Sequence, residues 1–108
     1  MKRGEVWWVN LDPAIGTEIK KTRPAVIVSN DSANKFLNRV QIVPLTSNIE
    51  KCYPSEALVT VNNEKSKAMA DQITTADKQR LKNLIGTISE KDMLAVEKAL
   101  KIQLGLPL

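Results

Sequence analysis

The sequence predicts a mainly β fold, a small barrel or sandwich with one helix packed on it. Short apolar runs alternate with turn residues about every ten positions, which is typical of a small β-rich domain. The clearest helical pattern follows these runs, close to the C-terminus. Strands followed by a terminal helix favour a barrel or sandwich. The length of 108 residues leads us to expect one domain, residues 1–108.

Strands are expected where Val, Ile, Trp and Leu gather between turn signals. Their predicted ranges are Glu5–Leu11, Pro24–Ser29, Arg39–Leu45, Glu56–Val61, Lys67–Thr74 and Leu84–Ile88. Pro24 is expected at the first position of its strand, where proline is tolerated. Residues 14–22 read as a polar loop, and residues 30–38 and 75–82 as polar connections that have room for a helical turn.

The C-terminal helix is predicted from its cap and its apolar stripe. Ser89 is a good N-cap, and acidic residues in the first turn suit the helix dipole. Gly105 and Pro107 are expected to end the helix. The stripe, at spacings of three and four residues, consists of Met93, Val96, Leu100 and Leu104.

The composition excludes several classes of site. The chain has no histidine, so a histidine general base, a Ser-His-Asp triad and a histidine-ligated metal are impossible. The single cysteine, Cys52, excludes an internal disulfide and a multi-cysteine metal site. The excess of 16 basic over 12 acidic residues gives a net charge of +4, a mild preference for an anionic partner.

No targeting or membrane segment is expected from the sequence. The N-terminus is charged where a signal peptide needs an apolar stretch. No apolar run approaches the roughly 20 residues that span a bilayer. We therefore expect a cytoplasmic protein that does not enter a membrane.

Three segments carry side chains suited to binding a phosphate or a base. The loop Gly16–Arg23 brings one carboxylate and three cations together before a buried strand, and an Arg fork binds phosphate bidentately. Thr46, Ser47 and Asn48 follow another strand and offer hydroxyl and amide groups. Residues 71–75 put Asp and Gln within a predicted strand, where they can read base edges. By residue type and spacing alone, an ordinary solvated loop is favoured for the first two segments, and a solvent-facing strand is an equal alternative for the third.

Trp7 and Trp8 are neighbours on the first predicted strand and so are expected on opposite faces. One fits the core, and the other is expected to be partly exposed or covered by a partner. A base-stacking platform is the alternative, although the chain has no interleaved row of aromatic residues.

These segments, taken in order, resemble the MazF/PemK-type toxins of type II toxin–antitoxin systems. The resemblance covers essentially the whole chain, and its ordered blocks with short gaps make it specific. The matching blocks are Arg3-Gly4-Glu5-Val6-Trp7, Leu11-Asp12-Pro13, Gly16-Thr17-Glu18, Thr22–Asn30, Val43–Ser47, Asp71-Gln72-Ile73 and Ile102–Leu106.

The resemblance implies an SH3-like small barrel with a C-terminal α-helix, acting as a homodimer. It implies metal-independent, sequence-specific cleavage of single-stranded RNA with no cofactor, and inhibition by a cognate antitoxin whose disordered acidic segment occupies the RNA groove. Arg23 and Thr46 match the family's principal catalytic residues, and Glu18 matches a residue with a catalytic or loop-ordering role. The expected RNA-binding residues are Thr17, Lys20, Lys21, Ser47, Asp71, Gln72 and Thr74.

The chemistry of these side chains suits such a reaction. Without a metal, the neighbouring 2′-OH attacks the phosphate and yields a 2′,3′-cyclic phosphate and a 5′-OH. Arg23 can stabilise charge on the phosphate, while a guanidinium that keeps its proton is unsuited to an acid–base role. Thr46 can donate a hydrogen bond to a non-bridging oxygen, and Glu18 is the expected acceptor of the 2′-OH proton.

Two positions depart from the family pattern. Some relatives carry an Arg where this chain has Met69, so Asp71 is not expected to act as a base with a partner Arg. Thr74 stands where relatives often have an Arg, which predicts a weaker phosphate grip there. The alternative function is therefore a non-catalytic RNA- or protein-binding module, or a relative acting on DNA gyrase.

Overall fold

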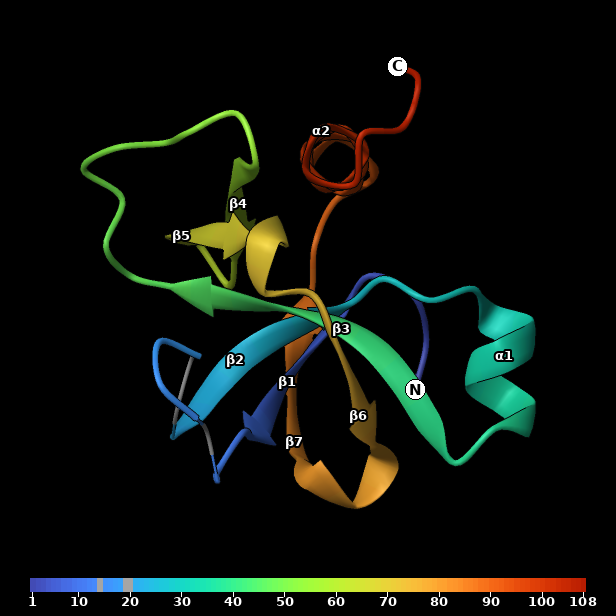
Figure 1. The fold of residues 1–108 in the computed structure, drawn as a ribbon. Helices are drawn as coiled ribbons and strands as arrows, with labels where there is room; N and C mark the ends of the chain where they lie inside the picture. The colour runs from blue at the N-terminus through green and yellow to red at the C-terminus, as the bar shows by residue number, and fades with distance from the viewer. Residues whose placement is uncertain (14, 19–20) are drawn as a thin grey trace.

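The computed structural model describes residues 1–13, 15–18 and 21–108, and these form a curled antiparallel sheet with one long helix (Figure 1). Within the described residues, no helix is long and apolar enough to cross a membrane. In chain order the elements are β1 (Glu5–Asn10), β2 (Thr22–Ile27), α1 (Asp31–Phe36), β3 (Arg39–Thr46), β4 (Glu56–Val61), β5 (Glu64–Met69), the 3-10 turn η1 (Ala70–Gln72), β6 (Thr74–Asp77), the 3-10 turn η2 (Lys78–Arg80), β7 (Leu81–Thr87) and α2 (Glu90–Gln103).

Strand β3 is the centre of the sheet. The strand order is β4-β5-β3-β2-β1-β7, and β6 also pairs with β3. Both β5 and β6 are antiparallel to β3: Leu45 and Thr46 pair with β5, whereas residues 39–42 pair with β6. The turn η1 joins these two partners where the sheet bends, as the yellow segment in Figure 1 shows.

This bend explains where the predicted strands differ from the observed ones. The single strand expected over Lys67–Thr74 is wrong, because β5 ends at Met69 and a new strand begins at Thr74. Asp71 and Gln72 therefore lie on a turn rather than within a strand. The helical turn expected in residues 75–82 is confirmed as η2, whose N-cap Asp77 accepts from the backbone N–H of Gln79 at 2.8 Å. β7 starts at Leu81, three residues earlier than predicted.

Pro24 lies deeper in its strand than the sequence suggests. Pro24 is the third residue of β2, not its first, and pairs with Trp8. On its other side, β2 pairs with β3 through residues 25–27, so the missing N–H of Pro24 interrupts no pair with β3. Pro44 pairs with Ala25 inside β3.

Two buried clusters fill the two sides of the sheet. The first core cluster includes Val6, Val26, Leu45 and Val61 together with the buried face of α2. The second core cluster consists of Val9, Ala25, Ile27, Val40, Ile42, Ala76 and Leu81. Consecutive strand residues alternate between them, as period-two side-chain geometry requires.

Helix α2 begins as predicted, with the Ser89 hydroxyl accepting from the backbone N–H of Asp92 at 3.1 Å. Its stripe is confirmed for Met93, Val96 and Leu100, but wrong for Leu104, which is 54% exposed. Leu104 is the C-cap, and Gly105 follows at φ +68°. The backbone N–H of Leu106 then donates to Lys101 at 2.8 Å, which closes the helix in a Schellman motif.

Candidate functional site

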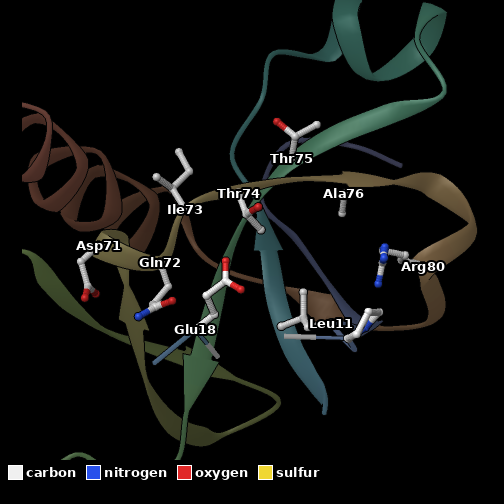
Figure 2. Close-up of a pocket in the computed structure, with 10 residues that line it drawn as sticks. Leu11, Glu18, Asp71, Gln72, Ile73, Thr74, Thr75, Ala76 and Arg80 are labelled. Atoms are coloured by element: carbon white, nitrogen blue, oxygen red, sulfur yellow. The ribbon is translucent and has the colours of Figure 1, made fainter. Parts of the chain in front are cut away.

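Two cavities lie beside the loop that joins β1 to β2. The first cavity has a volume of about 420 Å³ and is drawn in Figure 2. Its lining residues come from that loop and from the chain between η1 and η2: Leu11, Pro13, Glu18, Asp71, Gln72, Ile73, Thr74, Thr75, Ala76 and Arg80. The second cavity, of about 500 Å³, is lined by Val6, Trp8, Lys21, Thr22, Arg23, Pro24, Leu45, Thr46, Ser47, Val61, Asn62, Glu64, Ser66 and Ile85.

The cavities open on different faces of the sheet. Ala76 of the first cavity belongs to the second core cluster, and Leu11 packs against that cluster. Val6, Leu45 and Val61 of the second cavity belong to the first core cluster. The β1–β2 loop borders both, because it supplies Glu18 to the first cavity and Lys21 to the second.

The structure divides the residues expected from the sequence between these cavities. Glu18, Asp71, Gln72 and Thr74 line the first, and Lys21, Arg23, Thr46 and Ser47 line the second. Thr17 is exposed in the loop and lines neither of them. Lys20 lies outside the described residues.

Arg23 and Thr46 lie on the neighbouring strands β2 and β3 and line the same cavity. Ala25 pairs with Pro44, and the same register extended by two residues would bring Arg23 opposite Thr46. Both side chains are half-buried. Side chains two residues apart on a strand share a face, so Arg23 is expected on the face of Ala25, which belongs to the second core cluster on the side of the first cavity. Arg23 nevertheless lines the second cavity. We therefore infer that this pair stands at the rim where the two faces of the sheet meet.

Thr46 is supported from the neighbouring strand β5. It pairs with Lys67, whose ammonium lies 3.3 Å from a carboxylate oxygen of Glu56. The same ammonium donates to the carbonyl of Lys51 at 2.9 Å, in the segment that follows Thr46 and Ser47. The Thr46 hydroxyl accepts from the backbone N–H of Asn48 at 3.3 Å and keeps its own proton for another acceptor.

Glu18 is held within its loop by a short turn. Its Oε1 accepts from the backbone N–H of Ile15 at 2.6 Å, and its own N–H donates to the carbonyl of Ile15 at 3.1 Å. Figure 2 shows the carboxylate directed toward Thr74. One bond thus orients the carboxylate, and Oε2 has no partner among the described residues. Asp71 lines the same cavity and brings a second carboxylate to it.

The two arms of the loop are tied together at its base. The carboxylate of Asp12 accepts from the backbone N–H of Lys21 at 2.9 Å, and Leu11 N–H donates to the carbonyl of Lys21 at 3.1 Å. Lys21 has φ +70°, a left-handed conformation that costs a residue with a side chain about 1 kcal/mol or more. The contacts to Leu11 and Asp12 hold this strained residue two positions before Arg23.

Arg80 is a site residue that the sequence reasoning missed. Its Nη1 donates to the carbonyls of Asn10 at 3.0 Å and Asp12 at 2.7 Å, and its side chain lines the first cavity. In the sequence it stands in the charged segment 75–82, which resembles a solvated turn. No spacing signal could have found it, because its partners are 68 and 70 residues away.

The two tryptophans take the opposite faces that were expected. Trp7 packs against the second core cluster and donates from Nε1 to Glu5 at 3.0 Å. Trp8 is 40% exposed and lines the second cavity. As for a metal site, the structure brings no three Cys, Asp or Glu side chains together as ligands within its described part.

Comparison with known families identifies the chain. Residues 2–104 match the model of the PemK-like, MazF-like toxin of type II toxin–antitoxin systems. The chain belongs to this toxin family. The resemblance seen in the sequence is thereby confirmed.

Relatives of this MazF-like toxin are similar along nearly their full length. It is 42% identical to an endoribonuclease, MazF9, of Mycobacterium tuberculosis, over 98% of both chains. It is 36% identical to an endoribonuclease MazF of Staphylococcus epidermidis, over 98% of this chain and 92% of that one.

The fold is also that of solved toxin structures. A mycobacterial endoribonuclease in complex with its cognate antitoxin aligns with a TM-score of 0.84 and 27% identity, over 100% of this chain and 98% of that one. MazF from Deinococcus radiodurans aligns with a TM-score of 0.87 and 24% identity, over 98% and 97% of the chains. The predicted small barrel with a C-terminal helix is confirmed.

Proposed function

We propose that this toxin is a sequence-specific endoribonuclease that cleaves single-stranded RNA without a metal or other cofactor. The observation that carries the proposal is the rim of the sheet, where Arg23 and Thr46 stand on adjacent strand ends beside the loop of Glu18. The endoribonuclease relatives, similar over nearly the whole chain, support the same activity.

The proposed reaction is attack of a ribose 2′-OH on the adjacent phosphorus. The oxygen–phosphorus bond to the 2′ oxygen forms and the bond to the 5′ oxygen breaks, so the products are a 2′,3′-cyclic phosphate and a 5′-OH. The 2′-OH proton passes to Oε2 of Glu18, and the leaving 5′ oxygen, on the opposite side of the phosphorus, takes its proton from water.

Arg23 and Thr46 act on the phosphate itself. The guanidinium of Arg23 stays charged and stabilises the negative charge that grows on the non-bridging oxygens. The Thr46 hydroxyl donates a hydrogen bond to one of these oxygens. Strand ends that are held by the sheet suit this task, because preorganised donors need no rearrangement during the reaction.

The remaining residues are proposed to bind the RNA on either side of the cleaved bond. Lys21 and Ser47 contact the backbone along the second cavity, and Lys20 and Thr17 extend that contact along the loop. Asp71, Gln72 and Thr74 offer donors and acceptors to base edges in the first cavity. The preference for a target sequence would then reside mainly in the first cavity.

We further propose three properties that follow from this activity. A cognate antitoxin covers the second cavity with an acidic, partly disordered segment, which complements Lys21 and Arg23. Two copies form a homodimer through a face that includes Trp8, which is 40% exposed. Residues 1–108 act as one toxin domain in the cytoplasm, where the mRNA is.

The proposed activity is tested with purified protein, a defined single-stranded RNA and excess EDTA. We expect the wild type to cut and to leave 2′,3′-cyclic phosphate and 5′-OH ends. RNA that shifts on a gel and is never cut, in any sequence context, would contradict the enzymatic function and favour a binding module. Light scattering tests the dimer, and a particle of 12.0 kDa at micromolar concentration would contradict it.

A further inference from the structure

We propose that Arg80 is a positioning residue that fixes the β1–β2 loop against the opposite wall of the first cavity. The inference rests on the proposed function, because it explains how the loop holds Glu18 for the reaction. Arg80 ends η2, on the wall that also provides Thr74 and Ala76. Its partners Asn10 and Asp12 stand where β1 passes into the loop.

The contact is a two-carbonyl bridge from one nitrogen. Nη1 of Arg80 donates to Asn10 at 3.0 Å and to Asp12 at 2.7 Å, and Arg80 is half-buried. Hydrogen bonds from a charged donor contribute more than neutral ones, and a planar guanidinium holds both acceptors in one fixed geometry. A lysine in its place keeps the charge and loses that geometry.

The bridge continues across the loop to its second arm. The carbonyl of Asp12 accepts from Arg80, and the carboxylate of Asp12 accepts from the backbone N–H of Lys21 at 2.9 Å. Lys21, with φ +70°, needs such contacts to stay in its strained conformation. The chain of contacts therefore runs from η2 through Asp12 to the residue two positions before Arg23. Glu18 lies between the two tied arms.

The consequence is that the position of the β1–β2 loop and the width of the first cavity depend on each other. Arg80 joins the wall that carries Thr74 to the loop that carries Glu18, and both line the first cavity (Figure 2). Loss of the bridge frees the loop from that wall while Arg23 and Thr46 keep their places on β2 and β3. We expect the chemical step to slow with little change in RNA affinity.

The test uses Arg80→Gln, Arg80→Lys and the control Arg39→Gln, an exposed arginine on β3. Limited trypsin digestion measures release of the loop as the rate of cutting after Lys20 and Lys21, with fragments identified by mass. Loss of the two charge-assisted bonds should raise that rate by about tenfold in Arg80→Gln, with a smaller rise in Arg80→Lys and none in Arg39→Gln.

Single-turnover cleavage in EDTA then gives rate and affinity separately. We expect Arg80→Gln to lower the rate by about tenfold, consistent with a misplaced catalytic group, and to leave RNA affinity and its salt dependence within about twofold. A salt slope reduced by about one, with an unchanged rate, would overturn the proposal in favour of a direct phosphate contact. An unchanged trypsin rate would overturn it as well.

The trypsin measurement and the cleavage measurement also separate this inference from the proposed function. A wild-type protein that cuts no RNA would overturn the endoribonuclease, while the trypsin arm would still support or overturn the bridge. If circular dichroism shows that Arg80→Gln does not fold, both measurements are made on Arg80→Lys. Its trypsin rate must then exceed that of wild type, and its RNA cleavage rate must fall below that of wild type, each by less than about tenfold.

Discussion

The rim of the sheet and the β1–β2 loop hold their functional groups in different ways. Arg23 and Thr46 belong to strands, so the pairing of β2, β3 and β5 fixes their backbones. Glu18 belongs to an exposed loop that is tied by a few long-range contacts, above all those of Arg80 and Asp12. The residues proposed to stabilise charge are thus built into the sheet, whereas the proposed proton acceptor depends on the fastening of one loop.

This difference predicts which changes act locally and which act at a distance. A strand residue keeps its place until the sheet itself is disturbed. A loop residue loses its place when any of its fastenings is removed. Changes at Arg23 should therefore affect the chemistry directly, and changes at Arg80 should affect it through position.

The largest effect is expected at the rim. Arg23→Ala removes the cation proposed to face the developing charge and should lower the single-turnover cleavage rate by about 10²–10³-fold. Arg23→Lys keeps the charge without the guanidinium fork, so its cleavage rate should lie between those of wild type and Arg23→Ala. The rates are measured on a defined RNA in EDTA with fold monitored by circular dichroism. Cleavage by Arg23→Ala at the wild-type rate would remove Arg23 from the site.

The next effect concerns the support of Thr46. Lys67→Met leaves the carboxylate of Glu56 buried without its cation, since these side chains are 10% and 12% exposed. The free energy of unfolding should fall by about 3 kcal/mol, measured by urea denaturation. Lys65→Met, at an exposed position of the same strand, is the matched control. Equal losses in the two variants would mean that the buried pair does not support this part of the sheet.

The smallest effect lies away from both cavities. A hydrogen bond from the backbone N–H of Arg3, at 2.7 Å, is the main cause that lowers the pKa of Asp31 below its usual range. Such a carboxylate stabilises the fold above its ordinary pKa of about 4, and the stabilisation is lost as pH falls below that. Asp31→Asn should therefore be slightly less stable than wild type at neutral pH, with a gap that closes in acid.

The same substitution serves as a control for the comparison. Asp31 is the first residue of α1 and accepts hydrogen bonds from Arg3 and Asn34, which do not line either cavity. RNA cleavage by Asp31→Asn should equal that of wild type at neutral pH. A stability gap that widens as pH falls would contradict the assigned direction of the pKa shift.

Local patterns were enough to predict most of the fold. Ser89 and Gly105 mark helix α2 because caps are short-range features of the sequence. The strand expected over Lys67–Thr74 failed because β3 changes partner along its length, from β6 to β5. That exchange is a long-range property, and nothing in the local alternation of residues 67–74 reports it.

The candidate site was predicted residue by residue but not in its arrangement. The family resemblance, rather than spacing alone, singled out Arg23 and Thr46, and the structure places them on the neighbouring strands β2 and β3, where both line the second cavity. The division between two cavities depends on the curl of the sheet, which the sequence pattern does not specify. Arg80 escaped notice because its role is to donate to backbone carbonyls, and such acceptors are present at every residue.

The most direct measurement compares Glu18→Gln with Glu18→Ala in single-turnover cleavage. The Gln side chain can still accept the N–H of Ile15, so it preserves the turn, but it cannot take the 2′-OH proton. If Glu18 is the proton acceptor, both variants lose about 10²-fold or more in rate. A Glu18→Gln enzyme that cuts at the wild-type rate while Glu18→Ala is slow would contradict the account and assign Glu18 to loop order alone.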